Sequence, residues 1–192
     1  MIVGMLELAA GPCRVLLDLE AGGRLASWRV SGLELLEPRN DGNHPFGWGS
    51  YPMVPWAGRL RRGRFSFDGT DYELPLNFFD QHAIHGTAYD ATWLHLSGGT
   101  DWAMLGLRLG DPWPFGGTVT HLLHLTASTL TQTLTVAAGD RDLPASLGWH
   151  PWFRRRLPNK LPVRRLLCRP FRNRPAATVW DHWTWSARPK TK

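Results

Sequence analysis

The stretch TVTHLLHLTASTLTQTLTV, residues 118–136, determines the fold class that the sequence predicts. Apolar side chains alternate there with threonines, which favour extended backbone. The apolar positions are Val119, Leu123 and Leu125 in the first half and Leu130, Leu134 and Val136 in the second. A period of two predicts two long β-strands that each turn one face toward a core.

A hairpin signal lies upstream of this stretch. Phe65-Ser66-Phe67 and Tyr72-Glu73-Leu74 alternate on either side of Asp68-Gly69, a pair that favours a tight turn between strands. Further strands are predicted at residues 2–8, 13–19, 24–30, 92–97 and 102–109. No long stretch keeps the ~3.6-residue apolar period of a helix. We therefore expect an all-β chain of antiparallel sheets packed face to face, although the periodicity alone fits a barrel as well as a sandwich.

Residues 38–62 are predicted to form a long loop. The region contains several glycines and four prolines, Pro38, Pro45, Pro52 and Pro55. Loops of this length inside a compact domain are usually functional or disordered. Its aromatic side chains argue against disorder, namely Phe46, Trp48, Tyr51 and Trp56. We expect the region to form a wall of a binding site.

Two histidines are the candidate catalytic residues. His85 is followed by Gly86, and His150 lies in the aromatic stretch LGWHPWF, residues 147–153. Imidazole exchanges protons near neutral pH, so a pair of histidines suggests acid–base chemistry on a small polar ring. The alternative for either residue is a structural histidine whose hydrogen bonds are satisfied.

Together these motifs resemble the aldose 1-epimerase (galactose mutarotase) family. The ordered elements are a proline-containing stretch before Gly58-Arg59, an aromatic strand ending at Asp68-Gly69, a strand leading to Asn77, then His85-Gly86, Asp111-Pro112-Trp113-Pro114-Phe115 and residues 148–153. The resemblance covers roughly residues 1 to 160. Its one departure is Gly58, where the family usually has asparagine. It implies an antiparallel β-sandwich of the galactose mutarotase-like supersandwich type, with sugar bound on a concave sheet and the C-terminal part incomplete.

The resemblance also implies roles for three polar residues. Mutarotation interconverts the α and β anomers of an aldose: a base removes the C1 hydroxyl proton while an acid protonates the ring oxygen. His150 would be the acid, and His85 would hold and polarise the same region of the sugar. Arg59 would donate hydrogen bonds to sugar hydroxyls. Without the resemblance, Arg59 would be interpreted as a surface arginine in a basic cluster.

Tryptophans are the candidates for stacking on the sugar. We expect Trp149 and Trp56 to bind substrate, and Trp93 and Trp152 have the same potential. Core packing is the alternative for each, because large aromatic residues dominate sandwich interiors. We expect no metal and no cofactor; His121 and His124, three positions apart on a strand, would point to opposite faces.

The expected catalytic base is missing from the sequence. By resemblance it would be a glutamate near the C-terminus, with a further carboxylate before it. The sequence has no glutamate after Glu73, and Asp181 is the sole acidic residue beyond Asp142. Two hypotheses follow: an aldose 1-epimerase-family isomerase that is weak or inactive, or a non-catalytic carbohydrate-binding protein. Either would take a hexose or hexose derivative; the sequence decides neither its phosphorylation nor the oligomeric state.

The charge of the chain is concentrated at its end. Residues 161–192 hold 8 of the 22 basic residues and one of the 16 acidic residues, so residues 1–160 have a net charge of −1. The end segment fits a solvated basic tail, an RNA-binding arm or, as we favour, an out-of-frame continuation. We predict a partial domain at 1–160 and an irregular tail at 161–192. Because the domain is nearly neutral, nucleic acid is not an expected partner.

The cysteines and the hydropathy of the sequence indicate the cellular compartment of the protein. Cys13 and Cys168 form neither a disulfide framework nor a metal-binding spacing, which fits a reducing compartment. No apolar run approaches the ~20 residues that span a membrane, and no secretory core is recognisable. We expect a cytoplasmic protein that does not bind membranes.

Overall fold

The regular structure of the chain is entirely β. The computed structural model describes residues 4–42, 44–155, 163–173 and 176–185, and these ranges contain strands β1 to β16 and no helix. The described part of the chain accordingly offers no helix that is long and apolar enough to cross a membrane.

The first sheet has six antiparallel strands. Its strands pair in the order β1-β2-β3-β5-β14, and β4 pairs with β3 outside this order. The strands are β1 (Met5–Ala10), β2 (Cys13–Asp18), β3 (Arg24–Val30), β4 (Leu33–Glu34), β5 (Ser50–Met53) and β14 (Gly148–Pro151).

The second sheet also has six antiparallel strands, and two small ribbons accompany the sandwich. The second sheet has the order β10-β11-β12-β13-β16-β15. Its strands are β10 (Leu94–Gly98), β11 (Trp102–Arg108), β12 (Thr118–Leu125), β13 (Thr129–Ala137), β15 (Val163–Asn173) and β16 (Ala176–Trp185). The ribbons are β6 (Arg59–Arg61) with β9 (His82–Ile84), and β7 (Arg64–Phe67) with β8 (Thr70–Glu73).

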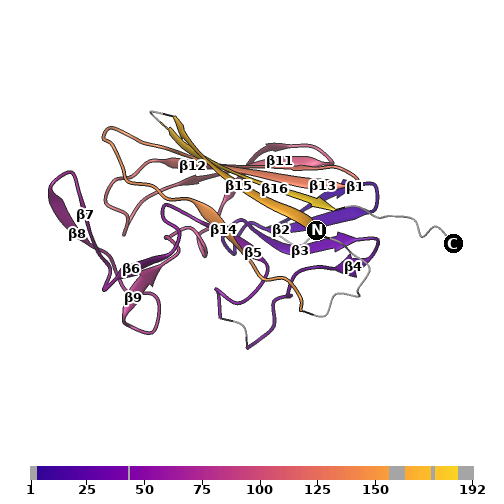
Figure 1. Ribbon diagram of the computed structural model, residues 1–192, viewed down its shortest axis with the longest axis horizontal. Helices are drawn as coiled ribbons and strands as arrows, with labels where there is room; N and C mark the ends of the chain where they lie inside the picture. Colours follow the sequence, from indigo (N-terminus) through magenta and orange to yellow (C-terminus); the bar gives the residue numbers. More distant parts are fainter. Residues whose placement is uncertain (1–3, 43, 156–162, 174–175, 186–192) are drawn as a thin grey trace.

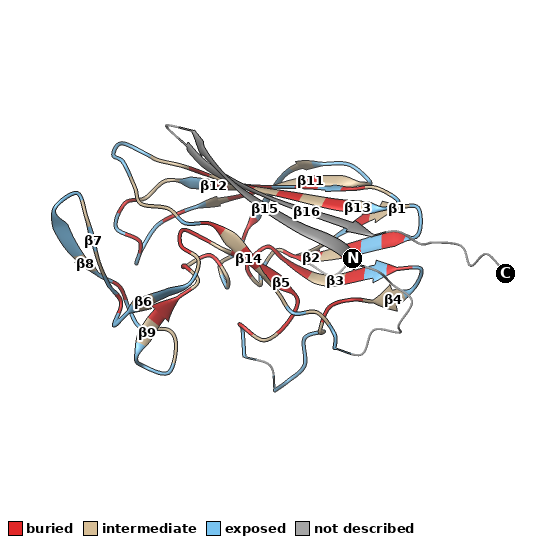
Figure 2. Cartoon of the chain, in the orientation of Figure 1, coloured by how far each residue is buried: buried red, intermediate tan, exposed pale blue. Residues whose placement is uncertain are grey.

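The two large sheets stack as layers, and the β7–β8 hairpin projects at one end (Figure 1). Buried residues recur along the strands of both layers (Figure 2). One hydrophobic core draws on both sheets, for example on Leu8, Val15 and Leu25 from the first and on Leu105, Leu123 and Leu134 from the second. No strand pairing joins the two sheets within the described ranges, so the fold is a sandwich and not a barrel.

The predicted strands correspond closely to the observed ones. Residues 118–136 form β12 and β13, and all six of their predicted apolar positions are buried. The prediction at 24–30 coincides with β3, and the Asp68-Gly69 turn joins β7 to β8. The loop prediction for 38–62 was too broad, because β5 and β6 lie within it: pairing with β14 and β9 gives these short segments a ladder.

The C-terminal segment differs in backbone conformation from the prediction. Residues 163–173 and 176–185, expected to be irregular, form β15 and β16, and β16 pairs with β13 from Thr129↔Thr184 to Ala137↔Ala176. A nine-residue edge of unpaired N–H and C=O groups on β13 favours pairing with any extended segment that reaches it. The division at residue 160 and the out-of-frame origin of the tail stay predictions.

Hydrogen exchange will test this pairing. We expect amides in β16 to exchange as slowly as those in β12, because both strands donate into ladders of the same sheet. The measurement is native-state amide exchange on the full chain, followed by mass spectrometry of peptides from 118–125 and 176–185. Fast exchange confined to 176–185 would show that the tail does not dock, in agreement with an out-of-frame origin.

Candidate functional site

The structure brings His85, His150 and Arg59 together. The imidazole rings of His85 and His150 lie 5.1 Å apart between centroids, edge to face at 66°. His150 is on β14 of the first sheet, and His85 follows β9. Arg59 pairs with Ile84 across the β6–β9 ribbon, beside His85, and its charge contributes to lowering the pKa of His85. Residues from three separate parts of the sequence therefore form one cluster.

Backbone geometry holds His85 in one orientation. His85 has a left-handed φ of 60°, and its N–H donates to the carbonyl of Gly58 at 3.0 Å. In return the Gly58 N–H donates to Nδ1 of His85 at 3.2 Å. Because Nδ1 accepts this bond, the neutral ring carries its proton on Nε2, where it can be donated to a ligand. A Cβ on Gly86 would lie 1.8 Å from the Val54 carbonyl oxygen, so only glycine fits after His85.

The backbone conformation explains why position 58 accepts glycine where the family usually has asparagine. Gly58 has a φ of +87°, a conformation that glycine adopts freely and asparagine tolerates better than most residues. A Cβ at this position would meet nothing within 4 Å. The site therefore keeps its backbone geometry with glycine here, and the position has room for the asparagine that the resemblance leads one to expect.

Both histidines are neutral at physiological pH. Burial lowers the pKa of His85 to about 4, with further contributions from the charges of His150 and Arg59. Burial also lowers the pKa of His150. No carboxylate is among the groups that shift either pKa, so neither ring has a negative partner that would favour its protonated form.

Aromatic rings surround the histidine pair. His150 lies between Tyr51, stacked at 5.1 Å and 7°, and Trp152, stacked at 5.5 Å and 25°. The strand register explains the first contact, because His150 pairs with Tyr51 across β14 and β5. Phe46 approaches the edge of His85 at 6.0 Å. Of the tryptophans named from the sequence, Trp152 is the one that adjoins the histidines, and it is 40% exposed.

Trp149 faces away from the site. Successive side chains of a strand point to opposite faces, so Trp149 enters the core beneath His150. Its indole N–H donates to Nε2 of His121 at 3.3 Å, and Oε1 of Gln132 lies 3.1 Å from the same nitrogen. His121 and Gln132 are both buried in the second sheet. Trp149 thus links the two sheets, and its contact with a substrate stays a prediction. His124 is exposed, on the opposite face from the buried His121, as expected.

Trp56 also lies apart from the histidine pair. It is buried in the main core and stacks on Trp113 at 5.8 Å. Together they line a small apolar cavity of about 160 Å³ beside the β7–β8 hairpin. Trp93 is buried as well, and its indole N–H donates to the Ala88 carbonyl. The structure thus places Trp56, Trp93 and Trp149 in the core, which was the alternative interpretation for each.

Arg24 organises the site, and the sequence analysis missed it. Its buried guanidinium donates to the carbonyls of Pro45, Trp48 and Tyr89, and also to that of Ala21. It lies over the Trp48 ring at 4.2 Å and the Tyr51 ring at 5.2 Å. Burial lowers its pKa to about 10. The available signal was an arginine at the first position of a strand in which Leu25, Trp28 and Val30 are apolar, although the same strand also holds Arg29.

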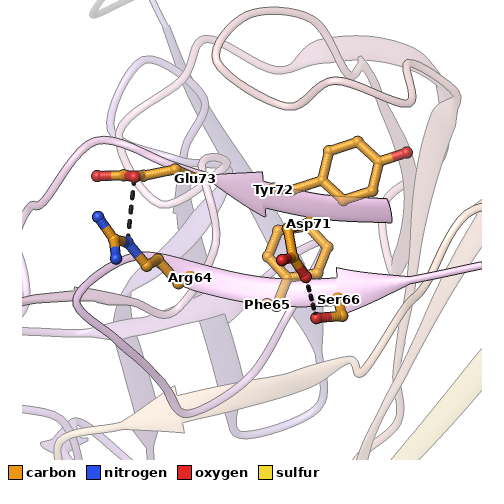
Figure 3. Close-up of a pocket in the computed structure, with 6 residues that line it drawn as sticks. All are labelled: Arg64, Phe65, Ser66, Asp71, Tyr72 and Glu73. Atoms are coloured by element: carbon orange, nitrogen blue, oxygen red, sulfur yellow. Dashed lines mark hydrogen bonds and ion pairs between the residues drawn. The ribbon is translucent and has the colours of Figure 1, made fainter. Parts of the chain in front are cut away.

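Other polar clusters of the described residues do not form a competing site. No group of three or more histidine, cysteine, aspartate or glutamate side chains in these ranges could hold a metal ion. A cavity of about 390 Å³ on the β7–β8 hairpin is lined by charged, polar and aromatic side chains, and its charged groups are already paired (Figure 3). Arg64 binds Glu73 at 3.1 Å, and Ser66 donates to Asp71.

Comparison with known proteins identifies the family. An aldose 1-epimerase family profile matches residues 17–166. The uncharacterized protein YphB of Escherichia coli (strain K12) is 33% identical over 138 residues, which are 70% of this chain and 47% of YphB. An antiparallel sandwich with this histidine pair and this profile defines the class: the chain belongs to the aldose 1-epimerase family.

Solved structures agree with this assignment. A structure from Escherichia coli K12, assigned as an aldose 1-epimerase, has 27% identity and a TM-score of 0.72, covering 86% of this chain and 55% of that one. The GalM/aldose epimerase homologue from C. elegans shares the fold at 17% identity and a TM-score of 0.68, covering 79% and 50%. The chain spans about half the length of the relatives it matches.

The buried His121 should make the protein sensitive to acid. Burial lowers its pKa from 6.5 to about 4, so the unfolded chain binds more protons between these values. The free energy of unfolding is therefore undiminished by His121 above about pH 6.5, and it falls as the pH drops toward 4. At pH 5 the buried His121 should lower the free energy of unfolding by roughly 2 kcal/mol. Urea unfolding from pH 7.5 to 5 should show a shallower loss for His121→Gln than for the exposed control His124→Gln; equal slopes would contradict the prediction.

Replacing Arg24 should loosen the site. Arg24→Met leaves four carbonyls without their donor, and we expect a loss of about 3 kcal/mol or more in urea unfolding. Arg24→Lys should recover little, since an ammonium cannot span the same carbonyls. The matched control is Arg29→Met on the same strand, whose exposed side chain pairs with Glu34 and should contribute less than about 1 kcal/mol. Equal losses for Arg24→Met and Arg29→Met would refute the organising role.

Proposed function

We propose that the chain binds an aldose against the cluster of His85, His150 and Arg59 and interconverts its α and β anomers weakly. The observation that carries this proposal is the pair of neutral imidazoles 5.1 Å apart beside an arginine, in a chain of the aldose 1-epimerase family. The proposed partner is a hexose or hexose derivative. The proposed setting is carbohydrate metabolism in the cytoplasm.

The geometry supports different roles for the imidazoles of His85 and His150. Nδ1 of His150 is buried, and Nδ1 of His85 is used by the Gly58 N–H, so Nε2 of each ring is the nitrogen left for a sugar. His85 then donates from Nε2 to a sugar oxygen and polarises it. The protonated fraction of His150 gives its Nε2 proton to the ring oxygen while solvent water takes the proton of the C1 hydroxyl, so that the bond between C1 and the ring oxygen breaks. Arg59 donates to hydroxyls that fix the orientation. Rotation about C1–C2 and reclosure give the other anomer.

We expect weak activity because, among the described residues, no carboxylate acts on His85 or His150. Ring opening also needs a base for the C1 hydroxyl proton, and no carboxylate acts on either histidine among the described residues. One positioned acid or base typically contributes roughly 10²–10⁴-fold, so losing one of two lowers the acceleration by about that factor. A depressed pKa also keeps the population of protonated His150 low at neutral pH.

A non-catalytic carbohydrate-binding protein is the second candidate. The ring stack of Tyr51, His150 and Trp152 supports it, because aromatic faces and neutral donors bind sugar without proton transfer. Both candidates predict sugar binding. They differ in the anomer exchange rate.

Exchange spectroscopy separates the two. We expect purified protein to accelerate anomer exchange of glucose or galactose little beyond buffer, because one group is lost and little of His150 is protonated at neutral pH. We expect His85→Ala and His150→Ala to abolish sugar binding, while His124→Ala, on the outer face, retains it. Binding should also weaken as the pH approaches 4, because protonated His85 can no longer accept from Gly58. Rapid exchange that His150→Ala abolishes would contradict the expected weakness and require another base.

A further inference from the structure

The loop between β8 and β9 contains a tight turn at residues 78–81 (Figure 1). Its two central residues, Phe79 and Asp80, have left-handed φ values of 48° and 52°. The Gln81 N–H closes the turn by donating to the Phe78 carbonyl at 3.2 Å. Left-handed φ at both central positions is the pattern of a type I′ turn, which asparagine, aspartate and glycine normally supply. A bulky phenylalanine in this conformation is strained.

The chain uses glycine in its other left-handed pairs, but not in this one. In the described ranges, each of the other left-handed non-glycine residues is followed by a glycine that is also left-handed. These pairs are Ser31-Gly32, Arg62-Gly63, Asp68-Gly69 and His85-Gly86. The Phe79-Asp80 pair lacks glycine, so both of its residues bear the steric penalty of a Cβ in this conformation.

The Phe79 side chain does not offset this strain by entering the core. It is 80% exposed, compared with 40% for Trp152. Burial of apolar surface is the usual way in which an aromatic side chain stabilises a fold, and this ring keeps most of its surface in water. Neither the backbone nor the side chain of Phe79 therefore explains its presence through stability. Strain of this kind is characteristic of ligand contacts and active sites.

The side chain of Asn77 fixes the turn relative to the histidine cluster. Its Nδ2 donates to the Ile84 carbonyl at 3.0 Å, and the Ile84 N–H donates back to Oδ1 at 2.7 Å. Ile84 is the residue before His85, so two hydrogen bonds join the turn to the backbone that carries this imidazole. A strained turn persists where its surroundings hold it in place, and these bonds meet that condition.

A row of aromatic rings connects Phe79 to the candidate site. The Phe78 and Phe79 rings lie 4.3 Å apart between centroids, edge to face at 67°. The Arg59 guanidinium lies over the Phe78 ring at 5.3 Å. Phe46 lies 6.5 Å from Phe78 and 6.0 Å from His85. Phe79 is therefore one ring removed from Arg59, at the solvent-exposed margin of the cluster.

We propose that Phe79 is a further substrate-contacting residue, whose ring covers the C–H face of a sugar held by Arg59 and His85. The inference rests on the proposed function, because it takes the sugar to lie against the histidine cluster. A sugar ring presents C–H groups on its faces, and an exposed aromatic ring offers them a flat apolar surface. Arg59 and His85 donate to the hydroxyls at the edge of the same ring. The strained turn is then the means by which the chain presents Phe79 to the ligand.

Two glycine substitutions separate the ring from the strain. Phe79→Gly removes the aromatic ring together with a strained φ, whereas Asp80→Gly relieves a strained φ of similar size and keeps the ring. Isothermal titration calorimetry with glucose and galactose should show sugar affinity about fivefold lower in Phe79→Gly and unchanged in Asp80→Gly. Phe79→Tyr keeps a flat ring and should retain the affinity within about twofold.

The same variants should be no less stable than the unsubstituted chain. Glycine adopts a left-handed φ without steric penalty, so we expect Asp80→Gly to raise the melting temperature by about 2 °C. Phe79→Gly should not lower it, since the side chain that is lost is mostly exposed. A ligand contact predicts lower affinity without lower stability, whereas a residue with a structural role would lose both.

The outcomes separate this inference from the proposed function. If neither sugar binds to the unsubstituted chain, the proposed function fails and the inference falls with it. If a sugar binds, and His85→Ala abolishes binding while Phe79→Gly leaves it unchanged, the inference alone is overturned. Equal weakening by Phe79→Gly and Asp80→Gly would assign the effect to the turn and not to the ring, which also overturns it. A melting temperature of Phe79→Gly well below that of the unsubstituted chain would do the same.

Discussion

The contact between Trp149 and His121 is the constraint on which the site depends. Trp149 enters the core, and its indole N–H bonds to a buried histidine of the opposite sheet. This bond fixes β14 against the second sheet. Because side chains alternate along a strand, burying Trp149 turns the next residue, His150, to the opposite face. The candidate acid is thus placed by an interaction in which it takes no part.

Arg24, a buried cation, has the corresponding role for the loops whose aromatic rings approach the histidine pair. Burying a guanidinium is costly unless its donors are satisfied, and Arg24 satisfies them with backbone carbonyls from three loops. Those loops carry Phe46, Trp48 and Tyr89. Phe46 and Tyr89 are 4.4 Å apart, and Phe46 also approaches His85. Arg24 therefore converts irregular backbone into a defined aromatic wall.

The candidate site combines neutral donors with aromatic rings, and no carboxylate is among the described groups that shift the histidine pKa values. Its polar groups are two neutral imidazoles and an arginine, and its walls are aromatic rings. Such a site can orient a polyol, because Nε2 of His85 donates while neutral and Arg59 adds further donors. It has no resident negative charge to take the C1 proton among the groups that influence the histidines. This difference between binding and catalysis underlies the proposed weak activity.

By itself the sequence determined the class of fold, the family and three residues of the site. Period-two patterns predicted β12, β13 and the β7–β8 hairpin, since alternation is a local property of extended backbone. The ordered motifs indicated His85, His150 and Arg59 because each lies in a short stretch of characteristic sequence. They could not show that β16 would complete the edge of β13, since strand pairing depends on which distant segments meet.

Only the tertiary structure decided what each aromatic residue does. Trp149 and Trp152 lie three positions apart in one motif, yet one enters the core and the other adjoins His150. Composition cannot distinguish them, because the face on which a strand residue lies is set by strand pairing and by which sheet covers it. Arg24 could not be recognised for the same reason: three of its carbonyl partners, in Pro45, Trp48 and Tyr89, come from two distant loops that only folding brings to it.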